Sequence, residues 1–273
     1  MNQMRSRLIS TAVGLPLALF LIILGGNIFN VFVLLISLIA LQEFYNAINQ
    51  KHKIYKPLTY IGYFSIVILF LILTNDISLI SLYFFFLVFV YLIILLFNTN
   101  FTIEDVSISL FGVLYVGMTF GSVILLRQSN YGKILTFYLL ILSWGTDTFA
   151  FFIGKFLGKH KLMPRVSPNK TIEGAIGGLI VSALLSTVYI YFVGQKIKLI
   201  PNVLTLFIVG ILGSMFSQLG DLVASDIKRS CDIKDFGKII PGHGGILDRF
   251  DGLIFVSSYL FILLFIYNRF LYL

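Results

Sequence analysis

The stretch Asp221–Asp251 reads DLVASDIKRSCDIKDFGKIIPGHGGILDRFD. It holds six of the twelve Asp and Glu residues of the chain and five of its twenty Lys and Arg residues. Elsewhere charged side chains are scarce, because they make up only 12% of the 273 residues. Acids interleaved with cations, in a chain otherwise suited to hydrocarbon, are what a site for a metal ion and several phosphates requires.

The remaining composition is typical of an integral membrane protein. Hydrophobic residues make up 58% of the chain and the mean hydropathy is +0.98, too apolar for a soluble globular domain. Apolar runs of about 20 residues recur along the whole length, and the alternation typical of a β-barrel is absent. We therefore predict an all-α, polytopic membrane protein.

The apolar runs predict about nine transmembrane helices. The first follows Arg5 and Arg7 and lacks a small-residue cleavage site, so we expect it to be retained rather than removed as a signal peptide. We divide the chain into N-terminal helices, residues 1–105, and a C-terminal catalytic region, residues 106–273, with polar loops 155–173 and 223–248. The predicted spans are 8–24, 28–48, 58–73, 79–97, 106–126, 134–153, 174–194, 202–222 and 252–271.

The distribution of positive charge predicts the orientation. With nine spans, the N-terminus and the loops after every second span share one side of the membrane, and they carry fifteen of the twenty Lys and Arg residues. The positive-inside rule therefore places the N-terminus and both polar loops in the cytoplasm. These cations lie in loops between spans, so the net charge of +8 does not indicate nucleic-acid binding. The single cysteine, Cys231, excludes an intramolecular disulfide and a cysteine-based zinc site.

Three aspartates are candidate metal ligands. Asp221 lies at the end of an apolar run, and if the helix continues it shares a face with Ser225 and Lys228. Asp248 and Asp251 are three residues apart at the start of the last span, which projects both carboxylates to one side. Such a pair can share a hard cation such as Mg²⁺. Favourable negative charge at a helix N-terminus is an alternative that needs no metal.

Two glycine-containing segments are candidate phosphate sites. Pro241–Gly245 is a flexible turn whose backbone N–H groups can face an anion near the start of a helix. Arg165–Gly178 combines hydroxyls, Lys170 and glycines where another helix begins, although Thr171 or Ser167 can equally be a plain N-cap there. Within the spans, Asp147 must face the protein interior or water, and Glu43 is interpreted as structural.

The motifs in these segments resemble a known family. Ser225–Arg229 (SDIKR), Lys234–Gly237 (KDFG) and Ile240–Asp251 (IPGHGGILDRFD) resemble the signature of the phosphatidate cytidylyltransferases, also called CDP-diacylglycerol synthases, with no departure across these 27 residues. Ser167–Thr171 (SPNKT), with Glu173-Gly174, and Asp147 resemble further motifs of that family. The resemblance covers the C-terminal half in detail and the N-terminal spans only in general character.

The resemblance implies a reaction and its setting. CMP is transferred from CTP to phosphatidic acid, giving CDP-diacylglycerol and pyrophosphate, by metal-assisted in-line attack of the lipid phosphate on the α-phosphate of CTP. The family is associated with Mg²⁺, with a monovalent cation such as K⁺ beside it, and with a homodimer. It also implies a multi-pass protein of the inner (plasma) membrane with its active site on the cytoplasmic side.

The resemblance also implies roles for individual residues. Asp221, Asp248 and Asp251 are the expected metal ligands, and Lys228 and Arg229 complete the expected catalytic set. The residues expected to bind substrate phosphates are Ser167, Lys170, Thr171, Ser225, Lys234, His243, Gly244, Gly245 and Arg249.

Two other classes of protein compete with this interpretation. A different lipid-phosphate enzyme, such as a polyprenol kinase or a CDP-alcohol phosphotransferase, is the first; the latter family has Asp-Gly followed by Ala-Arg, whereas Asp251-Gly252 is followed here by Leu253 and Ile254. A transporter with ion-relaying acids is the second. It predicts matching motifs in two related halves, and no internal repeat is present.

Overall fold

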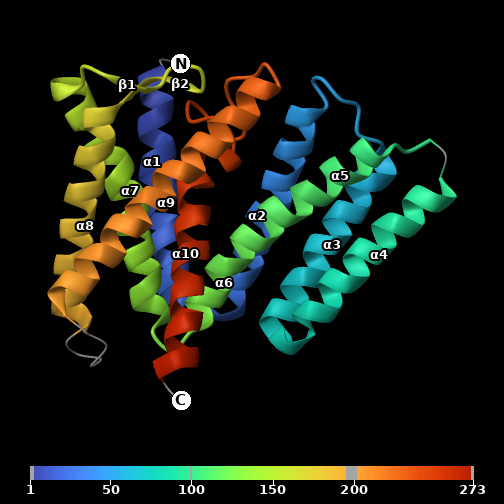
Figure 1. Cartoon of the computed structure of the whole chain (residues 1–273), viewed down its shortest axis with the longest axis horizontal. Coiled ribbons are helices and arrows are strands. Elements are labelled where there is room, and N and C mark those ends of the chain that lie inside the picture. Colours follow the sequence, from blue (N-terminus) through green and yellow to red (C-terminus); the bar gives the residue numbers. More distant parts are fainter. Residues whose placement is uncertain (1–2, 99, 195–201, 272–273) are drawn as a thin grey trace. The chain divides into compact units, whose positions relative to one another are not determined.

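The structure is a computed structural model that describes residues 3–98, 100–194 and 202–271. It is helical almost throughout (Figure 1). The helices are α1 (Gln3–Leu24), α2 (Gly26–Ile48), α3 (Lys56–Asn75), the short 3₁₀ turn η1 (Ile77–Leu79), α4 (Ile80–Phe97), α5 (Ile103–Gly112), the π-helical η2 (Val113–Met118), α6 (Thr119–Gln128), α7 (Gly132–Leu157), α8 (Ile172–Gly194), α9 (Val203–Ser230) and α10 (Leu247–Leu271).

The prediction of an all-α, polytopic membrane protein is confirmed. Among the described residues, eight helices are long and apolar enough to cross a membrane, and a shorter apolar stretch, Ala12–Leu24, lies in α1. The exception to all-α structure is a two-stranded antiparallel sheet, β1 (Lys161–Met163) and β2 (Ser167–Thr171), inside the predicted loop 155–173. Lys196 and Lys198, which entered the charge count, lie outside the described residues.

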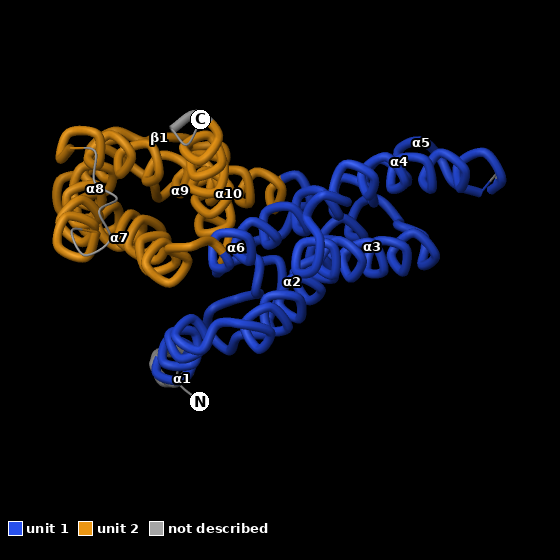
Figure 2. The backbone as a smooth tube through the Cα atoms, turned by 90° about the horizontal axis from the view of Figure 1, so that it is seen from below, with its two compact units in different colours: residues 1–128, 230–249 blue, residues 129–229, 250–273 orange. Residues whose placement is uncertain are grey.

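The chain divides into two compact units (Figure 2). Unit 1 comprises residues 1–128 and 230–249, and unit 2 comprises residues 129–229 and 250–273. These boundaries differ from the division expected at residue 105. That division, which assigns catalysis to residues 106–273, remains a prediction. The polar segment Ser230–Arg249 belongs with the N-terminal helices, although it connects two helices of unit 2.

Unit 1 contains a satisfied polar cluster within its helical core. The Tyr45 hydroxyl lies 3.0 Å from the Ser109 carbonyl oxygen, to which it donates. The Ser109 hydroxyl donates to the Leu58 carbonyl oxygen at 3.1 Å and lies 2.9 Å from the Tyr91 hydroxyl. Unpaired polar groups are costly away from water, so these bonds let α2, α3, α4 and α5 pack together with hydroxyls inside.

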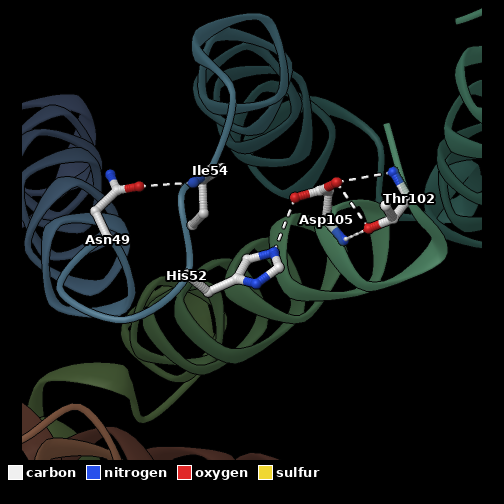
Figure 3. Close-up of polar contacts among 5 residues, drawn as sticks. All are labelled: Asn49, His52, Ile54, Thr102 and Asp105. Carbon is white, nitrogen blue, oxygen red and sulfur yellow. Dashed lines mark hydrogen bonds and ion pairs between the residues drawn. The ribbon is translucent and has the colours of Figure 1, made fainter. Parts of the chain in front are cut away.

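At one end of unit 1, the loops after α2 and α4 lie close together (Figure 3). His52, in the loop after α2, lies 2.8 Å through Nε2 from Oδ1 of Asp105, whose side chain is only 4% exposed. Oδ2 of Asp105 accepts hydrogen bonds from the backbone N–H and the hydroxyl of Thr102, at the end of the loop after α4. The same end holds an ion pair between Lys51 and Asp232, with 2.7 Å between Nζ and Oδ2.

Removing the His52 side chain is expected to destabilise this end of unit 1. Asp105 is buried and would lose one of its hydrogen-bond partners, so His52→Ala should lower the free energy of unfolding by about 1–3 kcal/mol. Thermal unfolding in detergent measures the change. Lys53→Ala is the matched control, because Lys53 is an exposed neighbour in the same loop. Equal midpoints for the two variants would contradict a stabilising role for the His52–Asp105 contact.

Unit 2 is built on a close pair of helices, α7 and α8, with the sheet at one of their ends (Figure 1). Gly174 and Gly178 of α8 lie directly against Ala150 of α7, where added side chains would overlap that residue. The Ser182 hydroxyl, further along α8, contacts the Leu142 carbonyl oxygen at 3.2 Å. Small residues at such a contact let helix backbones approach closely, which fixes the hairpin against the end of α7.

Candidate active site

Helix α9 positions Asp221 well inside a helix rather than at its end. The predicted span ended at residue 222, whereas α9 continues to Ser230. As expected for a continued helix, the Ser225 hydroxyl donates to Oδ1 of Asp221 at 3.4 Å. Lys228, one turn further, is buried with 8% of its surface exposed, whereas Arg229 is exposed. The polar loop expected from residue 223 therefore begins only after Ser230.

The hairpin β1–β2 is fastened to the start of α8. The carboxylate of Glu173 accepts hydrogen bonds from the backbone N–H groups of Lys159 and His160, and lies 2.6 Å from Nδ1 of His160. The Thr171 hydroxyl accepts from the backbone N–H of Gly174 at 3.2 Å. Of the two candidate N-caps, Thr171 makes this bond, and Ser167 instead begins strand β2.

This anchoring brings Lys170 and Asp221 together. Nζ of Lys170 forms an ion pair with Oδ2 of Asp221, and both side chains are about one quarter exposed, at 27% and 26%. A cavity of about 400 Å³ opens beside the pair. Three motifs that lie far apart in the sequence line this cavity: Asp147 from the sixth predicted span, Asn169, Lys170 and Thr171 from the hairpin, and Gln218 and Asp221 from α9.

Unit 2 also concentrates acidic charge near this cavity. Asp251, which is 8% exposed, lies within electrostatic reach of Asp221, Asp147 and Lys228. The backbone N–H of Gly252 donates to Oδ1 of Asp251 at 2.8 Å. Carboxylates near one another in apolar surroundings repel, and the nearby Lys228 offsets part of that repulsion.

The donor set suits a hard cation in its chemistry. Mg²⁺ prefers oxygen ligands and usually keeps positions for water or substrate phosphate oxygens, which matches Asp221 and Asp251 together with a phosphate-bearing ligand. Among the described residues, no three Asp, Glu, His or Cys side chains lie close enough together to hold a metal ion as a group. A metal ion bound by any of these carboxylates would therefore need oxygens of a bound ligand to complete its coordination.

Asp248 occupies the first turn of α10 and organises the backbone around it. Helix α10 begins at Leu247, before the predicted start at residue 252. Asp248 and Asp251 are buried, whereas Arg249 between them is exposed. Oδ2 of Asp248 accepts hydrogen bonds from the backbone N–H groups of Phe236 at 2.8 Å and Gly245 at 2.9 Å.

The glycine turn before α10 uses several of its own backbone N–H groups. His243 donates to the Ile240 carbonyl oxygen and Ile240 donates to the Gly244 carbonyl oxygen, both at 2.9 Å. Gly244 has φ 87°, a left-handed conformation that favours glycine. The N–H groups of His243 and Gly245 are thus committed within the protein, whereas the sequence suggested that they face a phosphate. Ligand binding by His243, Gly244 and Gly245 remains a prediction.

Comparison with known proteins identifies the family. Residues 5–267 match the cytidylyltransferase family. The chain belongs to this family. It is 33% identical over 279 residues to the phosphatidate cytidylyltransferase of Bacillus subtilis, covering 98% of this chain and 100% of that protein. It is 39% identical over 272 residues to the phosphatidate cytidylyltransferase of Staphylococcus haemolyticus, covering 96% and 99%. The resemblance indicated by the motifs is confirmed.

The predicted site residues of this cytidylyltransferase fall into two groups. Unit 2 holds Ser167, Lys170, Thr171, Asp221, Ser225, Lys228, Arg229 and Asp251, and unit 1 holds Lys234, His243, Gly244, Gly245, Asp248 and Arg249. In unit 1, Lys234 lines a second cavity of about 340 Å³ together with Asn46, Gln50 and Lys238. The individual roles of both groups remain predictions.

Sequence reasoning interpreted Glu43 of the cytidylyltransferase as an isolated structural residue. In the structure its carboxylate is buried against the polar segment of unit 1, where it accepts hydrogen bonds from the backbone N–H groups of Ile246 and Leu247. The signal available in the sequence was the acid itself, because an ionisable residue in a membrane span is expensive unless it has partners. The sequence did not indicate which partners it has.

Proposed function

We propose that the chain transfers CMP from CTP to phosphatidic acid, forming CDP-diacylglycerol and pyrophosphate. Its relatives are named for this activity, and the Lys170–Asp221 pair beside the cavity in unit 2 carries the proposal. A cation and an acid held together beside a cavity of a membrane protein suit a lipid phosphate that must meet a nucleotide and its metal ion. Apolar walls between spans suit the acyl chains.

The chemistry is a nucleotidyl transfer. An oxygen of the lipid phosphate attacks the α-phosphorus of CTP and forms a new P–O bond. The bond between the α-phosphorus and the bridging oxygen to the β-phosphorus breaks, and pyrophosphate leaves with that electron pair. The attacking oxygen is already anionic, so the main obstacle is repulsion between two polyanions. Lys170, Lys228 and Arg229 are the side chains of unit 2 proposed to offset it.

Mg²⁺ is the proposed cofactor, with Asp221 and Asp251 as its ligands in unit 2 and Asp248 assigned by family resemblance. When bound, such an ion neutralises phosphate charge and polarises the phosphoryl group under attack. The carboxylates supply hard oxygen donors, which supports the assignment. K⁺ as a second cation and a homodimer remain predictions.

We place the N-terminus and the active site on the cytoplasmic side of the inner membrane. The excess of Lys and Arg supports this side. Contacts within unit 1 agree, since the loops after α2, α4 and α9 meet at one end through the His52–Asp105 and Lys51–Asp232 pairs. Cytoplasmic CTP can reach loops on that face.

Pyrophosphate release tests the proposed function. Purified protein in phosphatidic acid-containing detergent micelles should release pyrophosphate from CTP only when both the lipid and Mg²⁺ are present. CDP-diacylglycerol should appear in equal amount, measured by mass spectrometry. Release that ignores the lipid, or no release in micelles that support a bacterial relative, would contradict the proposal.

Replacing Lys170 is expected to weaken substrate binding. Lys170→Gln removes a cation beside the cavity, so the KM for CTP or phosphatidic acid should rise by about 10-fold to 100-fold, the scale of one charge-assisted hydrogen bond. Lys161→Gln is the matched control, because Lys161 is exposed on the neighbouring strand β1. Steady-state kinetics measure both, and unchanged KM values in Lys170→Gln would remove Lys170 from the binding site.

A further inference from the structure

Glu43 of α2 caps a helix to which it is not connected in sequence. Glu43 is buried, with only 3% of its surface exposed. Oε1 accepts the backbone N–H of Ile246 at 3.0 Å and Oε2 accepts that of Leu247 at 2.9 Å. The first N–H groups of an α-helix have no partner inside the helix and carry its positive end. Glu43 therefore supplies both the acceptors and the negative charge that the start of α10 requires.

The loop approaches the Glu43 carboxylate closely because glycines leave room for it. At Gly237 and at Gly245, an added methyl group would overlap the carboxylate oxygens. Neither glycine has a positive φ, so backbone conformation does not explain glycine at these positions. The space that Glu43 fills gives a steric explanation at both.

Glu43 and Asp248 together accept four backbone N–H groups of the segment 236–247, two each. The Asp248 carboxylate accepts hydrogen bonds from the N–H groups of Phe236 and Gly245, and the Glu43 carboxylate accepts them from Ile246 and Leu247. The residues held by Glu43 immediately precede Asp248, so they fix the backbone from which the Asp248 side chain extends. A glutamine cannot replace Glu43 fully, because its NH₂ group would face one of the two donors.

We propose that Glu43 is a positioning residue for the transfer reaction, holding the segment 236–247 so that Asp248 keeps its place. This inference rests on the proposed function. A carboxylate buried in a membrane helix is costly unless its partners compensate for the desolvation. Among the residues that the structure describes, the hydrogen-bond donors to Glu43 are the N–H groups of Ile246 and Leu247, directly before Asp248.

Kinetics of Glu43 variants test the proposal. In Glu43→Gln, kcat for pyrophosphate release should fall at least about tenfold, the scale found for lost partners of metal ligands, with smaller changes in both KM values. The fall in kcat should be larger in Glu43→Ala, because glutamine keeps one of the two acceptor oxygens and alanine keeps neither. Glu104→Gln, an exposed acid of the same unit, should retain wild-type kcat. Wild-type kcat in Glu43→Ala would overturn the proposal.

Hydrogen exchange separates positioning from general damage. Glu43→Ala should raise deuterium uptake in peptides that cover 236–247 and leave α3 and α4 at wild-type levels. Uptake raised throughout unit 1, with the loss of kcat explained by an unfolded fraction, would overturn a specific role. If the wild-type protein releases no pyrophosphate, the proposed function is contradicted. If the wild-type protein is active and Glu43→Ala keeps its kcat, only the role of Glu43 is contradicted.

A double-mutant cycle tests whether the Glu43 carboxylate is the reason that position 237 requires glycine. Gly237→Ala should lower kcat, because the new methyl group meets the Glu43 carboxylate. Combined with Glu43→Ala, the same change should add little further loss, since the overlapping group is gone. Losses that multiply fully in the double variant would show that the two residues act separately and would overturn this part of the proposal.

Discussion

Asp248→Asn is expected to lower kcat by about 100-fold to 1,000-fold, the scale of losing one preorganised electrostatic group at a reacting phosphate. The amide oxygen can take the position of Oδ2 and keep the hydrogen bonds from Phe236 and Gly245. The fold should therefore persist while the negative charge is lost. Pyrophosphate release at saturating CTP and phosphatidic acid measures the change, and thermal unfolding confirms that the variant is folded.

The matched control for this variant is Asp232→Asn. Asp232 has a 77% exposed side chain and φ 56°, a conformation that asparagine adopts readily. The control loses only a surface ion pair with Lys51, which contributes about 0–1 kcal/mol. It should keep wild-type kcat. Equal kcat values for Asp248→Asn and Asp232→Asn would show that Asp248 has no part in catalysis.

Asp221→Asn is expected to change the metal requirement as well as the rate. Loss of one carboxylate should raise the Mg²⁺ concentration for half-maximal activity by at least about 10-fold to 100-fold, and kcat at saturating Mg²⁺ should also fall. The variant further leaves Lys170 without its acidic partner beside the cavity. A Mg²⁺ titration of pyrophosphate release measures both effects.

The Mg²⁺ titration separates a metal ligand from a simple partner of Lys170. If Asp221 served only to hold Lys170, then Asp221→Asn would raise a substrate KM and leave the Mg²⁺ dependence unchanged. That outcome would move the proposed metal site away from α9. Asp232→Asn, titrated in parallel, should show the wild-type Mg²⁺ dependence.

The sequence predicts the membrane helices of this chain well and their ends less well. Apolar runs record burial in hydrocarbon, whereas a helix ends where its hydrogen bonding ends. Helix α9 therefore continues past the predicted limit at residue 222 to Ser230, through the polar residues that follow Asp221. Helix α10 begins at Leu247 instead of residue 252, because Glu43 satisfies the N–H groups at its start.

The candidate site could be predicted by residue type but not by arrangement. The strands β1 and β2 contain charged residues and Pro168 and have no apolar alternation, so the hairpin depends on Glu173 and the neighbouring helices. The pairing of Lys170 with Asp221 joins two segments that sequence spacing cannot relate. The motifs identify which residues matter, and only the fold shows which of them meet.

The long separation between Glu43 and its partners has a consequence for biogenesis. Glu43 leaves the ribosome 203 residues before Ile246, which corresponds to roughly 10–40 s of translation. During that interval α2 enters the membrane with a carboxylate that lacks both of these N–H donors. Unit 1 can complete its native hydrogen bonding only after α7, α8 and α9 have been made, so α2 of the nascent chain carries Glu43 without these hydrogen bonds until the loop arrives.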